Sequence, residues 1–159
     1  NGSEENLEIR PVYLRLLNLI ERLHRQLLDV IKDELERVDQ PDINAVQALL
    51  LYNIGDAELT AGELRTRGHY LGSNVSYNLK KLVEAGYISH SRSESDRRSV
   101  RVSLTPAGFA VRDKVDALFA RQLDSLEKVG DVSAEMVAGT NLTLDRLERF
   151  WADQIRYQL

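Results

Sequence analysis

The residues most able to bind a ligand lie between positions 72 and 105 of this 159-residue chain. One face of a predicted helix in this stretch carries polar side chains at helical spacing, about 100° per residue: Ser73, Asn74, Tyr77, Lys80 and Lys81. Amides, hydroxyls and ammonium groups are the groups with which proteins contact base edges and phosphates. This face therefore indicates a nucleic-acid-binding surface, and a merely solvated helix face is the alternative interpretation.

The distribution of charge favours the nucleic-acid interpretation. Residues 60–104 contain eight Lys or Arg and four acids, a local net charge of +4. The rest of the chain contains 13 basic and 21 acidic residues, a net charge of −8, so the whole chain is acidic at −4. A basic region within an acidic chain is typical of a phosphate-binding face.

The residues around the polar face predict a short helix followed by a β-hairpin. Ser73 stands at an N-cap position, and Gly86 stands where the helix should end. The opposite face of the helix carries an apolar stripe: Val75, Leu79, Leu82 and Val83. Apolar and polar residues alternate over 100–104, as in a half-buried strand, and a matching strand begins at Ile88. The loop between the strands carries three cations: Arg92, Arg97 and Arg98. A helix followed by a basic-tipped hairpin predicts a winged helix-turn-helix.

Periodicity and capping residues predict the elements on either side. The expected helices are 11–38, 43–54, 60–67, 105–129 and one beginning after Ser133. The expected helix starts are Pro11, Pro41-Asp42, the capping box Thr60–Glu63, Thr105-Pro106 and Ser133. Gly55 should end the second helix, 58–60 should be extended, and 68–72 should form a turn.

These elements predict a mainly α fold with a small β-hairpin wing and long helices at both ends. A first helix of about 28 residues spans roughly 40 Å, more than a compact domain of this size can cover. We therefore expect a second copy of the chain to pack against its ends. We assign residues 1–40 to an N-terminal dimerisation helix, 41–106 to a winged helix DNA-binding lobe and 107–159 to C-terminal dimerisation helices.

Composition excludes several other functions. The chain has no Cys, which rules out disulfides, thiolate catalysis and thiolate metal sites. No apolar run approaches the ~18 residues of a membrane span, so we expect no membrane partner and a cytoplasmic location. No catalytic motif is present, and the three His lie in different predicted elements, so we expect no enzyme activity, no metal and no cofactor.

Several short motifs occur together with the spacing of one regulator family. They lie at residues 59–64, 73–76, 82–88, 96–98 and 102–108, with Gln47 in the helix before them. On these motifs the chain resembles the MarR (multiple-antibiotic-resistance regulator) family of bacterial winged helix regulators over about residues 43–108. The resemblance implies a homodimer that binds a pseudo-palindromic operator in double-stranded DNA, usually as a repressor. It also implies release by a small aromatic or phenolic effector.

The resemblance assigns roles to individual residues. The positions expected to face base edges and nearby phosphates are Ser73, Asn74, Ser76 and Tyr77. Lys80 and Lys81 are better placed for the DNA backbone. In the wing, Arg97 should enter the minor groove, and Arg98 should either contact phosphate or pair with Asp96. Tyr77 departs from the family, many of whose members carry Arg at this position.

Two residues are candidates for an effector pocket, because the family places effectors near the first helix. His24 lies on the apolar side of that helix and Tyr52 near the end of the second, although residues in such positions are more often packed core residues than ligand contacts. A different class of function is also open. A winged helix can act as a protein-interaction module, in which the basic wing meets an acidic partner.

Overall fold

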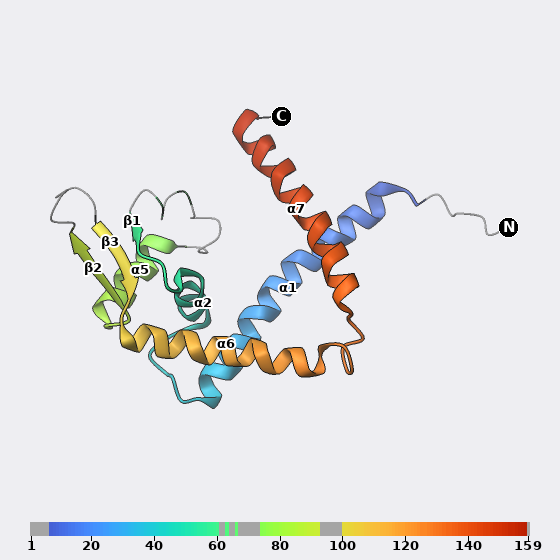
Figure 1. Ribbon diagram of the computed structural model, residues 1–159. Helices are drawn as coiled ribbons and strands as arrows, with labels where there is room; N and C mark the ends of the chain where they lie inside the picture. Colours follow the sequence, from blue (N-terminus) through green and yellow to red (C-terminus); the bar gives the residue numbers. More distant parts are fainter. Residues whose placement is uncertain (1–6, 61–62, 64–65, 67–73, 93–99, 159) are drawn as a thin grey trace. The chain divides into compact units, whose positions relative to one another are not determined.

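The structure is a computed structural model that describes residues 7–60, 63, 66, 74–92 and 100–158. It divides into two compact units, Asn1–Leu118 and Phe119–Leu159. The first unit holds α1 (Ile9–Arg37), α2 (Ala45–Ile54), β1 (Leu59–Thr60), α5 (Val75–Glu84), β2 (Ile88–Arg92) and β3 (Val100–Leu104). Helix α6 (Pro106–Leu126) begins in the first unit and ends in the second, which also holds α7 (Ala134–Tyr157) (Figure 1).

The long first helix is confirmed and begins two residues earlier than predicted. Helix α1 contains 29 residues, a length of about 44 Å. It ends in a Schellman motif, in which Asp39 adopts the left-handed conformation (φ 55°) and the Gln40 amide donates to the Leu35 carbonyl at 2.9 Å. Only Ile31, Glu34 and Leu35 of this helix are buried in the chain, all in its C-terminal third.

The predicted cap of the second helix is wrong. Helix α2 begins at Ala45, and its N-cap is Asn44, whose side chain accepts from the Gln47 amide at 2.8 Å. The Gln47 side chain accepts in return from the Asn44 amide at 3.1 Å, which completes a capping box. Asp42 lies outside the helix because its carboxylate is bound elsewhere. Gly55 ends α2 at φ 58°, as predicted.

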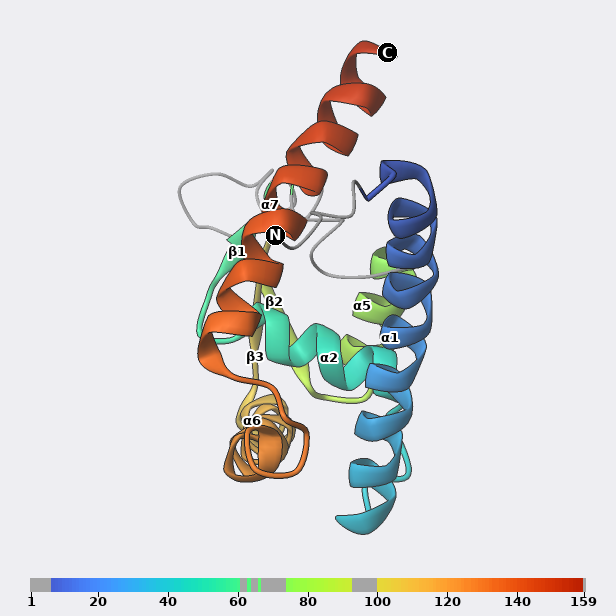
Figure 2. The same ribbon diagram turned by 90° about the vertical axis from the view of Figure 1, so that its right-hand side faces the viewer.

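Helix α2 lies at the centre of the first unit and contacts α1, α5 and β3 (Figure 2). Four of its residues are at most 2 % exposed, as expected for a helix that is apolar on most sides: Ala48, Leu50, Leu51 and Ile54. The core is completed from the other elements by Ile31, Leu59, Leu82, Val111 and Val115. Fully burying each such side chain contributes about 1.5–3 kcal/mol, so this core holds α5 against α2.

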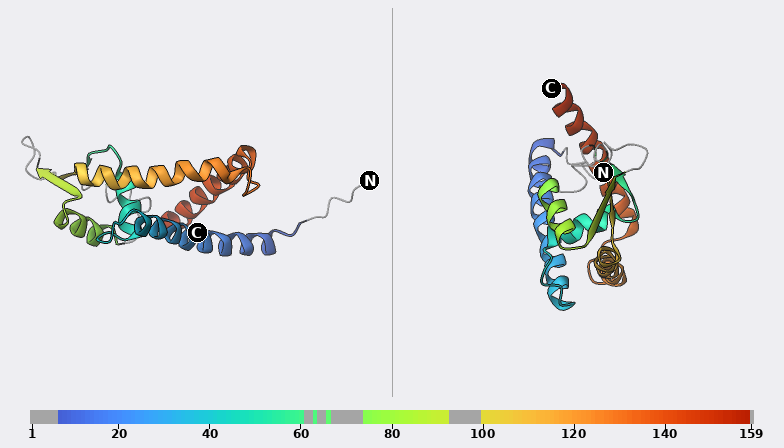
Figure 3. Two further views of the ribbon diagram at one scale, coloured as in Figure 1. Left: turned by 90° about the horizontal axis from the view of Figure 1, so that it is seen from below. Right: turned by 90° about the vertical axis from the view of Figure 1, so that its left-hand side faces the viewer.

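The predicted strands are confirmed and form an antiparallel sheet of order β1-β3-β2 among the described residues. Leu59 pairs with Val102, and Ile88 pairs with Leu104. These four side chains are buried on one face, whereas Ser89 and Ser103 lie on the other with their hydroxyl oxygens 3.3 Å apart. Helix α5 and the β2–β3 hairpin lie next to each other at one end of the unit (Figure 3).

Several predicted helix ends are confirmed by their hydrogen bonds. The Thr105 hydroxyl oxygen accepts from the Gly108 amide at 3.2 Å at the start of α6, and Ser133 accepts from the Met136 amide at 3.2 Å at the start of α7. The Thr60 hydroxyl accepts from the Glu63 amide at 3.2 Å, as the capping box predicts. The turn at 68–72 lies outside the described residues. No described helix is long and apolar enough to cross a membrane.

Candidate nucleic-acid interface

Helix α5 presents the polar face that the sequence predicts. Its five described polar candidates are Asn74, Ser76, Tyr77, Lys80 and Lys81, and none of them is buried. Tyr77 is 60 % exposed although it is aromatic, while Leu82 on the opposite face is 1 % exposed. The helix therefore has one face fixed in the core and one face available to a ligand.

The start of α5 leaves the Asn74 side chain unused by the helix. The helix begins at Val75, one residue later than expected from Ser73, and Asn74 holds the N-cap position in the left-handed conformation (φ 53°, ψ 41°). The Asn74 side chain makes no cap hydrogen bond, so its amide is available to an external donor or acceptor. Three other candidates, Ser73, Arg97 and Arg98, lie outside the described residues together with most of the wing loop.

Tyr77 and Lys81 lie together on the exposed face. The Lys81 ammonium is 5.7 Å from the centre of the Tyr77 ring and 4.0 Å from the Glu84 carboxylate. Exposed contacts of this kind are worth at most about 1 kcal/mol. Since a phosphate offers the ammonium a full negative charge, these contacts orient Lys81 without preventing a DNA contact.

A polar side chain that the sequence analysis missed lies beneath this face. Asn78 is 6 % exposed, and its carbonyl oxygen accepts from Gln47 Nε2 at 3.4 Å. Gln47 thus connects the α2 capping box to α5. The available signal was the position of Asn78 within the apolar stripe, three residues after Val75, where a polar side chain needs a buried partner.

A second polar cluster lies where the chain leaves α5. We call Gln40, Asp42, Tyr87 and Lys114 the polar joint. The Tyr87 hydroxyl donates to Asp42 Oδ2 at 2.5 Å, and Gln40 Nε2 is 2.8 Å from both the Tyr87 hydroxyl and Asp42 Oδ1. Lys114 Nζ donates to Gln40 Oε1 at 2.8 Å.

The pKa values of the polar joint follow from these contacts. Burial, followed by the hydrogen bond to Asp42, raises the pKa of Tyr87 to about 12. The hydrogen bonds from Tyr87 and then Gln40 lower the pKa of the Asp42 carboxyl. The joint is therefore a neutral phenol bound to an ionised carboxylate at neutral pH.

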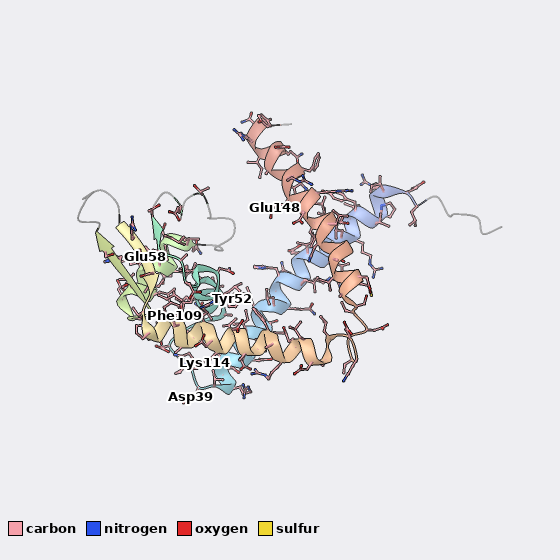
Figure 4. The ribbon with its side chains drawn as sticks, in the orientation of Figure 1. Asp39, Tyr52, Glu58, Phe109, Lys114 and Glu148 are labelled. Atoms are coloured by element: carbon pink, nitrogen blue, oxygen red, sulfur yellow. The ribbon has the colours of Figure 1, made fainter. Side chains whose placement is uncertain are left out.

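The two effector candidates differ in exposure. His24 is exposed on α1. Tyr52, which is labelled in Figure 4, is half-buried on α2. The first unit has a hollow of about 650 Å³ between the end of α1 and the start of α2, lined mainly by residues 28–46, and neither candidate lines it. Among the described residues, no group of three His, Cys, Asp or Glu side chains could hold a metal ion.

The fold and the exposed face of α5 define the class of this protein. Residues 43–108 match the winged helix DNA-binding domain family, which covers the segment from before α2 to the start of α6. Over 145 residues, the chain is 36 % identical to the exopolysaccharide II synthesis transcriptional activator ExpG of Rhizobium meliloti. This match covers 91 % of the chain and 74 % of ExpG. The protein is a winged helix DNA-binding transcriptional regulator.

Solved structures of one family of such regulators share its fold. A mutant of Escherichia coli MarR in complex with operator DNA matches with a TM-score of 0.64 and 22 % identity, covering 89 % of this chain and 99 % of that one. BpsR of Bordetella bronchiseptica, whose DNA binding is regulated by 6-hydroxynicotinic acid, matches with a TM-score of 0.63 and 15 % identity, covering 84 % and 98 %. Together with the domain match and the similarity to ExpG, these likenesses show that the chain belongs to the MarR family.

Proposed function

We propose that this protein binds a specific pseudo-palindromic operator in double-stranded DNA as a homodimer, with α5 in the major groove and the wing beside it. The observation that carries this proposal is the exposed polar face of α5, which lies in a segment of net charge +4 within an acidic chain. The regulator would act where its DNA target lies, in the cytoplasm.

In this pose each exposed residue has a distinct task. Asn74, whose amide the helix does not use, and Tyr77 read base edges, whereas Ser76 bonds either a base or a nearby phosphate. Lys80 and Lys81 contact the backbone and give affinity that does not depend on sequence. In the wing, Arg97 suits the negative potential of a narrow minor groove, and Ser73 and Arg98 add contacts to phosphate or base.

The homodimer is supported by apolar surface that one chain leaves exposed. On α1, Ile9 is 77 % exposed and Leu23 is 59 % exposed. On α7, which has no buried residue, Phe150 is 55 % exposed and Ile155 is 72 % exposed. Apolar patches of this extent on long helices are typical of obligate interfaces. A second copy would bury them and present two recognition helices.

We also propose that a small aromatic or phenolic anion weakens DNA binding, with His24 and Tyr52 as the residues nearest to it. BpsR supports this proposal, because its DNA binding responds to a small aromatic acid. A ligand changes the equilibrium only if it binds the DNA-incompetent state more tightly. Repression remains our prediction, although ExpG is described as an activator. A promoter–reporter assay in the presence and absence of the protein tests whether it represses or activates transcription.

Selection of bound sequences from a random duplex pool tests the central proposal. We expect a two-fold symmetric sequence with half-sites about 10–10.5 base pairs apart. We also expect the free protein in solution to have twice the 18.1 kDa chain mass. Asn74→Ala should weaken operator binding by about 1–3 kcal/mol and random-DNA binding much less. A selected pool without symmetry, or an Asn74→Ala protein as selective as the parent, would refute the pose.

The second candidate function is a protein-interaction module, favoured by the same basic segment. Such a module would bind acidic partners without preferring any duplex sequence. Failure to enrich any sequence from the random pool, together with binding to acidic protein surfaces, would support this function over operator binding.

A further inference from the structure

The polar joint connects three parts of the chain that lie far apart in sequence. Tyr87 is 45 residues from Asp42 and 47 from Gln40, and Lys114 is 74 residues from Gln40. All four belong to the first compact unit. Their hydrogen bonds measure 2.5–2.8 Å, shorter than the 3.4 Å contact between Gln47 and Asn78. The residues of the joint are therefore in closer contact with one another than Gln47 is with Asn78.

The joint holds the end of α5 through its backbone as well as its side chains. Gly86 takes φ 86° after the helix, and the Tyr87 amide donates to the Leu82 carbonyl at 2.9 Å, which completes a Schellman motif. The position of the Tyr87 ring is thereby fixed to the last turn of α5. Tyr87 is also only 7 % exposed, so its side chain is part of the core at this end of α5.

The end of α1 is built in the same way. Asp39 takes φ 55°, and the Gln40 amide donates to the Leu35 carbonyl. Gln40 and Tyr87 are thus the equivalent residues of two Schellman motifs, one at the end of each helix, and their side chains bond to each other. Lys114 adds the first part of α6, and Figure 4 shows it close to the end of α1 marked by Asp39.

A small movement at this point has a large effect at the other end of α5. The helix contains ten residues and is about 15 Å long. A tilt of about 5° at its exit would move its first residues by about 1.3 Å for that length. Hydrogen bonds to base edges do not tolerate such a displacement. The base-reading residues at the start of α5 therefore depend on the joint at its end.

We propose that Gln40, Asp42, Tyr87 and Lys114 are positioning residues that set the direction of α5 relative to the end of α1 and the first part of α6, and thereby the half-site spacing that the dimer accepts. This inference rests on the proposed operator-binding homodimer. The four residues act through α5, so none needs to touch DNA. A loosened joint lets α5 adopt more orientations and therefore lowers the discrimination between operators of different spacing.

The variants Tyr87→Phe, Lys114→Met and the double variant test the joint. Each is compared with Val111→Ala, which truncates a core side chain that is 1 % exposed and removes no hydrogen bond. Urea unfolding identifies conditions in which all variants are folded. Kd is then measured for the selected operator, and for the same half-sites with one base pair inserted between them.

The Kd ratio is the Kd for the duplex with the inserted base pair divided by the Kd for the selected operator. We expect Tyr87→Phe to reduce this ratio by about three- to tenfold, the equivalent of one net hydrogen bond. Val111→Ala should leave this ratio unchanged despite lower stability. Tyr87 and Lys114 are linked through Gln40, so their effects on the ratio should be non-additive in the double variant.

If the effects on the Kd ratio are additive, or if the Kd ratio of Tyr87→Phe equals that of Val111→Ala, the joint only stabilises the fold. Either result would overturn the inference. The parent protein separates this failure from failure of the proposed function. If the parent protein selects no symmetric operator, the proposed function is refuted, and there is no half-site spacing for the joint to set. A parent with a strict spacing that Tyr87→Phe retains refutes only the inference.

Discussion

Replacing Gly108 by alanine should destabilise the first unit, although alanine normally favours a helix. Gly108 is the third residue of α6, and a Cβ atom built on it would lie 2.2 Å from the Tyr87 carbonyl oxygen and 3.3 Å from Leu104 Cβ. The Tyr87 atoms that it would meet belong to the backbone, so no side-chain rotation relieves the clash. Helix α6 must instead move away from the exit of α5.

The magnitude follows from what this movement breaks. The Tyr87 carbonyl accepts from the Thr105 amide at 3.1 Å, and the Thr105 hydroxyl donates to the Gly86 carbonyl at 2.6 Å. Losing two hydrogen bonds costs about 1–3 kcal/mol, and overpacking costs about the same again. Alanine favours the helix over glycine by about 1 kcal/mol, so we expect a net loss of about 1–5 kcal/mol.

Urea unfolding followed by far-ultraviolet circular dichroism, at one protein concentration, measures this loss. Gly139→Ala in α7 is the matched control, because, apart from its chain neighbours and the backbone of its own helix, no atom of the described residues lies within 4 Å of the Cβ it would add. That variant should gain about 0.5–1 kcal/mol. A Gly108→Ala protein as stable as the parent would show that α6 and the exit of α5 are not in the close contact described.

Three further predictions concern individual side chains. Asp39→Gly should raise the unfolding free energy by about 1 kcal/mol, because only glycine adopts φ 55° without strain, and differential scanning calorimetry should record a higher Tm. The stability difference between the parent and Tyr87→Phe should be fully present below pH 10 and should be lost as pH rises towards about 12, because the pKa of Tyr87 is raised in the folded state. The contribution of the Asp42 carboxylate to the unfolding free energy should be present above pH 3.8 and should be lost as pH falls below it, because the pKa of that carboxyl is lowered in the folded state. Lys81→Ala should weaken operator and random DNA alike and reduce the slope of log K against log salt by about one, as measured by fluorescence anisotropy; an unchanged slope would mean that Lys81 contacts no phosphate.

The sequence by itself determined the order and type of the described elements. Apolar residues at three- and four-residue intervals located α1, α5 and α6, and alternation over 100–104 located β3. Thr105 and Ser133 can be predicted as caps, because an N-cap bonds a backbone amide only two or three residues away. The exposed face of α5 was also predictable, since helical spacing places Tyr77 and Lys81 opposite Leu82.

Tertiary structure decided which polar residues take part in long-range contacts. Asp42 has the residue type and position of a helix cap, yet its carboxylate binds Tyr87, 45 residues later, and Asn44 caps α2 instead. Asn78 and Gly108 likewise acquire their roles from Gln47 and from the Tyr87 carbonyl. Local patterns specify local hydrogen bonds, because these form within one helical turn. Partners tens of residues apart meet only after the core has packed, so their contacts cannot be predicted directly from the spacing of residues along the chain.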